Sequence, residues 1–99
     1  MSAMLDLEQV TQISSEVAKA NLPPQGVVRV QSEPTVDSQG QDALYLTIVV
    51  APEAADRVSG DAVVNTLVQI HDRLRDAGDD RFPIIEYTTE AELEEIGVP

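Results

Sequence analysis

His71 is the residue whose type could most readily do chemistry, since it is the only histidine and the chain has no cysteine. One imidazole cannot supply the three or four nitrogen and sulfur ligands of the usual zinc sites. General acid-base chemistry would need a carboxylate held beside the ring, but Asp72 projects about 100° further round a helix. We therefore interpret His71 as a partly buried residue at a helix margin. A small enzyme or ligand-binding domain that uses His71 and nearby carboxylates is the alternative.

Other motifs with chemical meaning are missing or incomplete. No serine lies in a G-x-S-x-G elbow, and no glycine-rich phosphate loop occurs. The segment DSQGQD, residues 37–42, lacks the alternating acids and the closing glutamate of an EF-hand, so it is interpreted as a plain hairpin loop. The sequence predicts no catalytic residue, no metal site and no cofactor, and it favours a protein without enzymatic activity.

Two groups of charged residues could contact a partner. Three of the six basic residues gather around the end of a predicted helix, either as partners of the acids beside them or as a forked site for a carboxylate or phosphate. Residues 86–95 hold five glutamates and no base, which is typical of a solvated face or of a docking segment for a basic partner. The candidate contact residues are Arg73, Arg75, Arg81, Glu90, Glu92, Glu94 and Glu95.

Composition predicts one soluble domain over residues 1–99. Hydrophobic residues make up 42% and charged residues 24%, as in ordinary globular chains. The net charge of −12 repels polyanions, which disfavours nucleic acid and anionic membranes as partners. No apolar stretch approaches the roughly 20 residues of a membrane span, and the first residues have no signal-peptide pattern. We expect a cytoplasmic protein without disulfides.

Hydrophobic periodicity predicts the elements that must position these residues. The expected order is α-β-β-α-β followed by a short helix, with residues 52–58 open between a helical turn and a loop. The predicted segments are a helix at 6–21, a strand at 26–33, a turn-rich loop at 34–42, a strand at 43–51, a helix at 59–78, a strand at 81–88 and a short helix after a T-x-x-E capping box at 89–92.

The helix at 59–78 is expected to organise the core. Its apolar residues are spaced for one buried stripe, which we expect to consist of Val63, Leu67, Ile70, Leu74 and Ala77. The strand at 26–33 should bury Val28 and Val30, and the strand at 43–51 is apolar on both faces and should be central. A right-handed crossover then makes the last strand parallel to the central one. The predicted fold is an α+β two-layer sandwich, with two helices on one face of a small three-stranded mixed sheet.

This element order resembles the topology of the bacterial type of KH domain, above all if residues 52–58 form a short helix. The resemblance implies a GXXG loop between two helices that clamps a nucleic-acid backbone. The corresponding VSGD has a single glycine, Gly60, followed by Asp61. With a net charge of −12, the sequence therefore disfavours RNA binding by this route.

We interpret the chain as an acidic interaction or accessory protein, antitoxin-like in one form, that binds an unidentified protein with a basic or mixed surface. Self-association as a homodimer through an exposed sheet edge is a further hypothesis.

Overall fold

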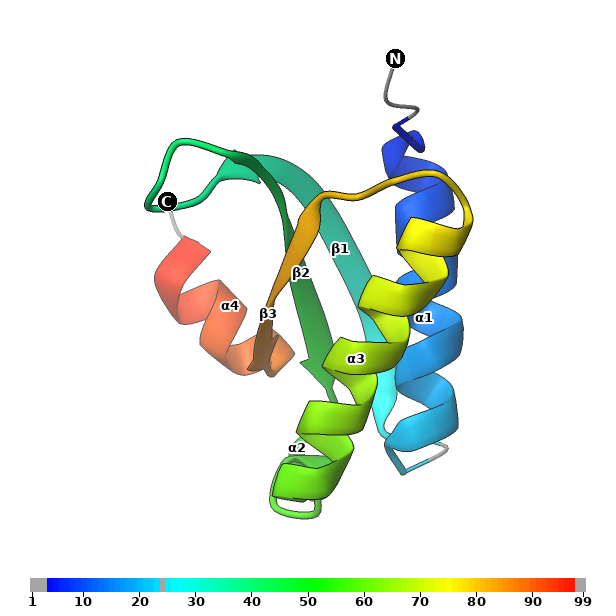
Figure 1. Cartoon of the computed structure of the whole chain (residues 1–99). Helices are drawn as coiled ribbons and strands as arrows, with labels where there is room; N and C mark the ends of the chain where they lie inside the picture. The colour runs from blue at the N-terminus through cyan, green and yellow to red at the C-terminus, as the bar shows by residue number, and fades with distance from the viewer. Residues whose placement is uncertain (1–3, 24, 98–99) are drawn as a thin grey trace.

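The computed structural model describes residues 4–23 and 25–97, with side chains up to residue 95. Two long helices cover one face of a three-stranded sheet, and a short C-terminal helix lies on the other side of the sheet (Figure 1). The elements are α1 (Leu7–Asn21), β1 (Val27–Val36), β2 (Asp42–Val50), α2 (Pro52–Ala55), α3 (Gly60–Asp76), β3 (Phe82–Thr88) and α4 (Glu90–Gly97). The predicted α+β architecture is confirmed.

The sheet has the strand order β1-β2-β3. β1 and β2 are antiparallel, with Glu33 opposite Tyr45, and β2 and β3 are parallel, with Leu46 opposite Ile85. β2 is therefore the central strand, as its apolar residues on both faces predict. Its side chains Leu44, Leu46 and Ile48 are fully buried.

The helix termini follow the sequence signals. Asp6 accepts a hydrogen bond from the Gln9 backbone N–H at 2.8 Å, and the Gln9 side chain accepts one from the Asp6 N–H at 3.2 Å. Ser59 caps α3 by accepting from the Ala62 N–H at 3.1 Å. Gly78 follows α3 with a φ of 102°, a left-handed conformation that glycine adopts without strain.

The buried stripe of α3 is rotated from the predicted one. Ile70 and Leu74 are fully buried as expected, but the third fully buried residue is Thr66, spaced four residues before Ile70. Val63 and Ala77 are exposed, and Leu67 is half-buried. α3 packs more extensively against α1 than against β3. The side chains spaced four residues apart, Thr66, Ile70 and Leu74, therefore face the core, and the side of the helix that carries Val63 faces outward.

β1 is longer than predicted, and its first residues face differently. It continues through Pro34 to Val36, which an edge strand tolerates because proline need not donate to a neighbour, so the predicted loop at 34–42 shrinks to 37–41. A register shift between Val27 and Arg29 inserts an extra residue. Val28 is therefore exposed and Val27 is buried in its place, whereas Val30 is buried as predicted.

The two short helices both form. Residues 52–58, for which the sequence allows a helical turn or a loop, begin with the helix Pro52–Ala55. The proline lies in the first turn of this helix. The Thr89–Glu92 capping box of α4 is present, since the Glu92 N–H donates to Thr89 Oγ1 and the Thr89 N–H donates to Glu92 Oε1, both at 3.2 Å.

Candidate interaction surface

The face of the sheet opposite α1 and α3 is mainly polar. Successive side chains of a strand point to opposite faces, so residues that alternate with the buried ones of β2 lie on this face. We call it the open face, and its polar side chains are Arg29, Gln31, Glu33, Tyr45, Thr47 and Glu86. The buried Val49, opposite Arg29, and the exposed Ile84, opposite Tyr45, also belong to it. A depression of about 430 Å³ runs over β1 and β2 here, lined by Gln31, Ser32, Glu33, Tyr45 and Thr47.

Two carboxylates border Tyr45 on the open face. The Tyr45 hydroxyl donates a hydrogen bond to Glu86 on β3, and Glu33 lies directly opposite Tyr45 on β1. The hydrogen bond to Glu86 raises the pKa of Tyr45 above its ordinary value, and the negative charges of Glu86 and Glu33 act in the same direction. The centre of this face is therefore an acceptor-rich surface.

α4 is tied beside the open face by an ion pair. Arg29 Nη2 lies 2.7 Å from Glu90 Oε1, and the hydrogen bond lowers the pKa of the Glu90 carboxyl. Leu93 is half-buried, whereas Glu94 and Glu95 are exposed and have no ion-pair partner within the described residues. We name the carboxylates on the open face and on the neighbouring α4 the acidic flank, and it consists of Glu33, Glu86, Glu92, Glu94 and Glu95.

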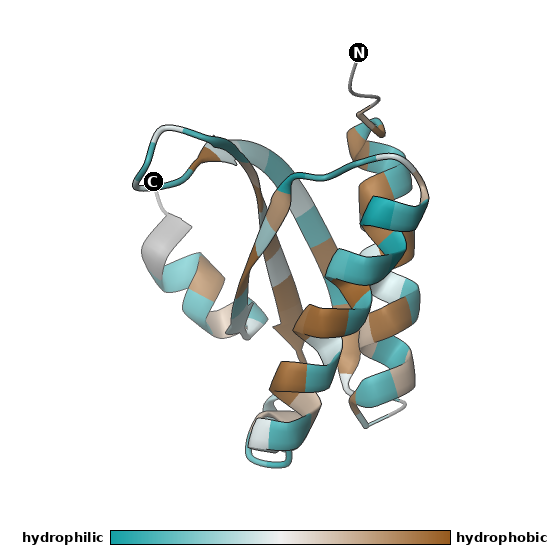
Figure 2. Cartoon of the chain, viewed as in Figure 1, coloured by the Kyte–Doolittle hydropathy of each residue, from teal (hydrophilic) through white to brown (hydrophobic). Residues whose placement is uncertain are grey.

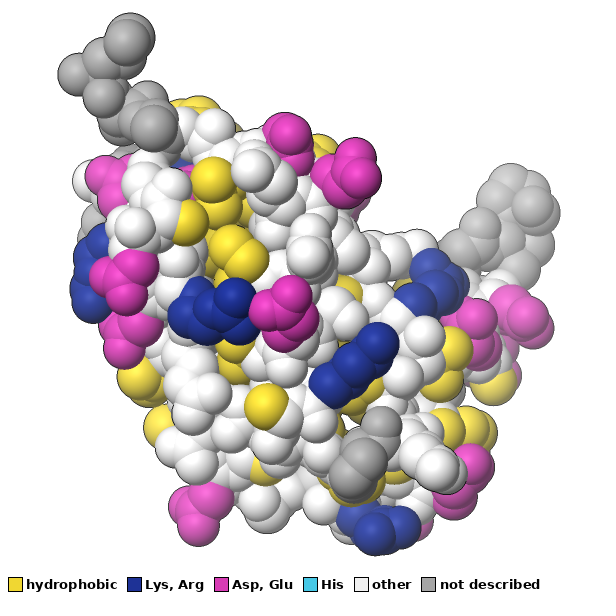
Figure 3. Space-filling model, turned by 90° about the vertical axis from the view of Figure 1, so that its right-hand side faces the viewer, with side chains coloured by type: hydrophobic (Ala, Val, Ile, Leu, Met, Phe, Trp, Pro, Cys, Tyr) yellow, Lys and Arg dark blue, Asp and Glu magenta, His cyan; other side chains and the backbone are white. Residues whose placement is uncertain are grey.

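The three candidate arginines do not converge on one site. Arg73 Nη2 lies 2.9 Å from Glu16 of α1, and Arg75 Nη2 lies 2.9 Å from Asp72 of its own helix. Arg81 is buried. The side of the molecule in Figure 3 shows basic side chains dispersed among acidic ones instead of forming one positive patch. The structure thus assembles no forked anion site from the three.

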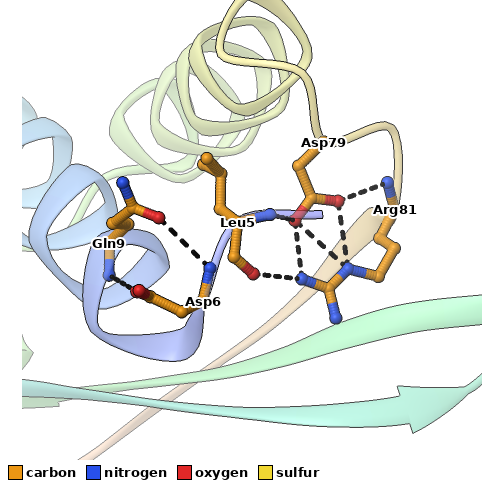
Figure 4. A network of polar contacts seen from close by, with 5 residues as sticks. All are labelled: Leu5, Asp6, Gln9, Asp79 and Arg81. Carbon is orange, nitrogen blue, oxygen red and sulfur yellow. Dashed lines mark hydrogen bonds and ion pairs between the residues drawn. The ribbon is translucent and has the colours of Figure 1, made fainter. Parts of the chain in front are cut away.

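Arg81 belongs to a buried network that sequence reasoning missed (Figure 4). Its Nη2 lies 2.6 Å from Asp79 Oδ2 and donates to the Leu5 carbonyl oxygen at 3.1 Å, while the Leu5 N–H donates to Asp79 at 3.2 Å. Burial by itself would raise the pKa of Asp79, but the hydrogen bonds from Arg81 outweigh it and the pKa is lowered. The network ties the turn after α3 to the segment before α1. Only the D-x-R spacing after Gly78 hints at it in the sequence.

His71 has an aromatic neighbour, not a carboxylate. Its ring lies edge-on to Phe82, with ring centroids 5.2 Å apart, and the residue is half-buried at the margin of α3. Within residues 4–23 and 25–97, no ion pair involves His71 and no group of three or more His, Asp or Glu side chains could hold a metal ion. The described helices also include none that is long and apolar enough to cross a bilayer.

The formation of α2 completes the element order that resembles the bacterial type of KH domain. The connection before α3 nevertheless keeps its single glycine, Gly60, in the place of a GXXG loop. No protein-family model, no curated protein and no solved structure matches this chain. The resemblance therefore rests on element order alone. The chain is therefore described by its own structure, as a two-layer α+β fold with an acidic flank along one side of an open sheet face.

Proposed function

We propose that this chain is a non-enzymatic binding module whose acidic flank docks a protein with a basic surface. The observation that supports the proposal is the distribution of charge. Four of the basic side chains, Arg29, Arg73, Arg75 and Arg81, are engaged in ion pairs within the chain. Among the described side chains, none of the five acids of the flank forms an ion pair, whereas Glu90, which lies next to the flank, pairs with Arg29.

A basic partner gains from this arrangement in two ways. Uncompensated surface carboxylates produce a negative potential that raises the association rate of a cationic protein. The flank is also held in place, because the capping box and the Arg29–Glu90 pair fix α4 beside the sheet. An accessory or antitoxin-like protein, which neutralises a basic protein by covering its positive surface, is one form of this function.

The test compares two variants that carry the same net charge. The flank variant Glu33→Gln/Glu94→Gln/Glu95→Gln spares the capping residue Glu92 and the ion-paired Glu90. The control variant Glu8→Gln/Asp76→Asn/Asp80→Asn removes three exposed acids elsewhere on the molecule. Each tagged protein is used to capture partners from its native cell extract at low and at high salt.

We expect a stoichiometric basic partner to bind the wild type and the control variant, and to be released by high salt or by the flank substitutions. The proposal fails if no stoichiometric partner is found, or if the flank variant retains the partner as well as the control does. The matched charge of the two variants separates a specific flank from a general effect of net charge.

A further inference from the structure

The side of the molecule formed by β3 and α3 carries an exposed apolar surface. Val64 and Val68 of α3 are 58% and 49% exposed, and Phe82 of β3 is 49% exposed. Ile84 of β3, 39% exposed, lies opposite Tyr45 and so extends the apolar surface round the edge of the sheet onto the open face. The contact between Phe82 and the half-buried His71 joins the two elements at one end. Figure 2 shows hydrophobic residues on successive turns of α3 and along β3. We name this surface the β3–α3 side.

β3 is also an edge strand. β2 occupies one of its edges, and no described strand pairs with the other. An unpaired edge exposes backbone N–H and C=O groups to any strand that can approach. Pro83 lacks a donor, but it stands at the start of β3, and the next two residues are the neutral Ile84 and Ile85.

The opposite edge of the sheet is built differently. β1 carries a bulge at its start, Pro34 in its second half and the charged residues Arg29 and Glu33, all of which discourage edge pairing. The outer surface of α1 beside it is mainly polar, with Glu8, Thr11, Gln12, Ser15, Glu16 and Lys19 lining a shallow depression together with Leu7. The β1 edge therefore carries a bulge, a mid-strand proline and two charges, whereas β3 has only Pro83 at its start and one charged residue, Glu86.

We propose that the β3–α3 side is the dimer interface for a second copy of this chain. A two-fold axis perpendicular to the sheet would pair β3 with its counterpart in antiparallel fashion and make one continuous six-stranded sheet. The same axis would bring the two α3 helices together on one face of that sheet. One symmetric contact would thus satisfy the unpaired edge and cover the apolar flank, which no described segment of the chain does.

The dimensions of this side suit a dimer. β3 has seven residues and is about 23 Å long at roughly 3.3 Å per residue. The sheet and the helix on it are two layers of about 10–12 Å each. This combined thickness, multiplied by the length of β3, gives a projected area of about 500 Å² per copy. The accessible area of a rugged surface exceeds its projection, so two copies bury more than the roughly 1,000 Å² expected of a biological interface.

The dimer should respond to salt in the opposite sense to partner binding. Each copy has a net charge of −12, so the two copies repel one another, and salt screens this repulsion. Salt should therefore strengthen the dimer, whereas it weakens the contact of the acidic flank with a basic partner. Failure of either proposal can thus be recognised separately.

The test is the molar mass in solution, measured by light scattering over a range of concentrations. The wild type should have twice the monomer mass of 10.7 kDa. The variant Val64→Lys/Val68→Lys should be monomeric, and because its lysines lower the net negative charge of each copy, greater overall repulsion between the copies is excluded as the cause. Lysine has a higher helix propensity than valine, so α3 should remain folded, which circular dichroism checks. Ile84→Lys, on the strand, should also be monomeric.

The control places the same change on the protected edge. Val28→Lys/Val36→Lys alters two exposed valines of β1 and should leave the dimer intact. The proposal is overturned if the wild type is monomeric at all concentrations up to about 1 mM, as it would be if the surface served another protein. It is also overturned if the dimer persists in Val64→Lys/Val68→Lys or dissociates in the β1 control.

Discussion

The buried ion pair between Asp79 and Arg81 is where a single substitution should be most destabilising. The two side chains are 0% and 9% exposed, and the Asp79 carboxylate also accepts the N–H of Leu5. Asp79→Asn removes the negative charge and leaves the guanidinium in a buried place without its counterion. We predict that this substitution lowers the free energy of unfolding by about 3–5 kcal/mol.

Urea denaturation followed by circular dichroism measures this loss. A domain of this size is stable by about 5–15 kcal/mol, so the single variant comes close to unfolding. The double variant Asp79→Asn/Arg81→Met removes both charges, keeps an acceptor for the Leu5 N–H and should be more stable than Asp79→Asn alone. The matched surface control is Arg75→Ala, whose ion pair with Asp72 is more than half exposed and contributes less than about 1 kcal/mol.

Two results would refute this reasoning. One is a cost for Asp79→Asn no larger than that of Arg75→Ala, which would mean that the pair behaves as a surface contact. The other is a double variant less stable than the single one, which would mean that the unpaired guanidinium is not the cause of the loss.

The same pair predicts a pH dependence. The pKa of Asp79 is lowered in the folded protein from its ordinary value of 3.8, so the unfolded chain takes up the proton first as the pH falls. The stabilisation is therefore fully present above the unfolded pKa and is lost as the pH falls through the lower folded pKa. As the pH falls through the unfolded value of 3.8 towards the lower folded pKa, the stability of the wild type relative to Asp79→Asn/Arg81→Met should decrease, and a difference that stays constant would contradict this assignment.

Two further predictions concern the core and a close backbone approach. Ile70→Ala should lower the free energy of unfolding by about 2–5 kcal/mol, whereas Gln69→Ala, on the exposed side of α3, should cost less than about 1 kcal/mol; equal losses in urea denaturation would contradict the observed stripe. Gly26→Ala should cost about 1–3 kcal/mol in the same assay, because an added Cβ would lie 2.7 Å from the Cβ of Ala54. Its control is Gly60→Ala, where nothing lies within 4 Å, and a similar loss at both glycines would rule out crowding as the cause.

The sequence predicts those parts of the fold that depend on neighbouring residues. The caps at Asp6, Ser59 and Thr89 involve partners three residues away, and each is present. The apolar alternation of β2 on both faces likewise identifies the central strand, because burial on two sides requires apolar residues on both. These features are encoded locally, so short windows of sequence are sufficient to find them.

Features that depend on packing between distant segments were not predictable in this way. The bulge that exposes Val28 is a property of how β1 pairs with β2, and the rotation of the α3 stripe depends on where α1 packs. The network of Asp79 joins residues 74 positions apart in the chain. For the candidate contact residues, the sequence shows that Arg81 is basic, but only the structure shows that it is buried against Asp79.

The two proposed surfaces are compatible in one assembly. Of the acidic flank, only Glu86 lies on β3, so a dimer through that edge leaves the parts of both flanks on β1 and α4 uncovered. A two-fold axis perpendicular to the sheet also places both flanks on the same face of the continuous sheet. A basic partner with two positive patches, or two copies of a partner joined to one another, could then be bound at both flanks with a gain in avidity. Repulsion between the two copies limits the dimer, and a bound basic partner would relieve it, so partner binding and dimerisation would reinforce each other.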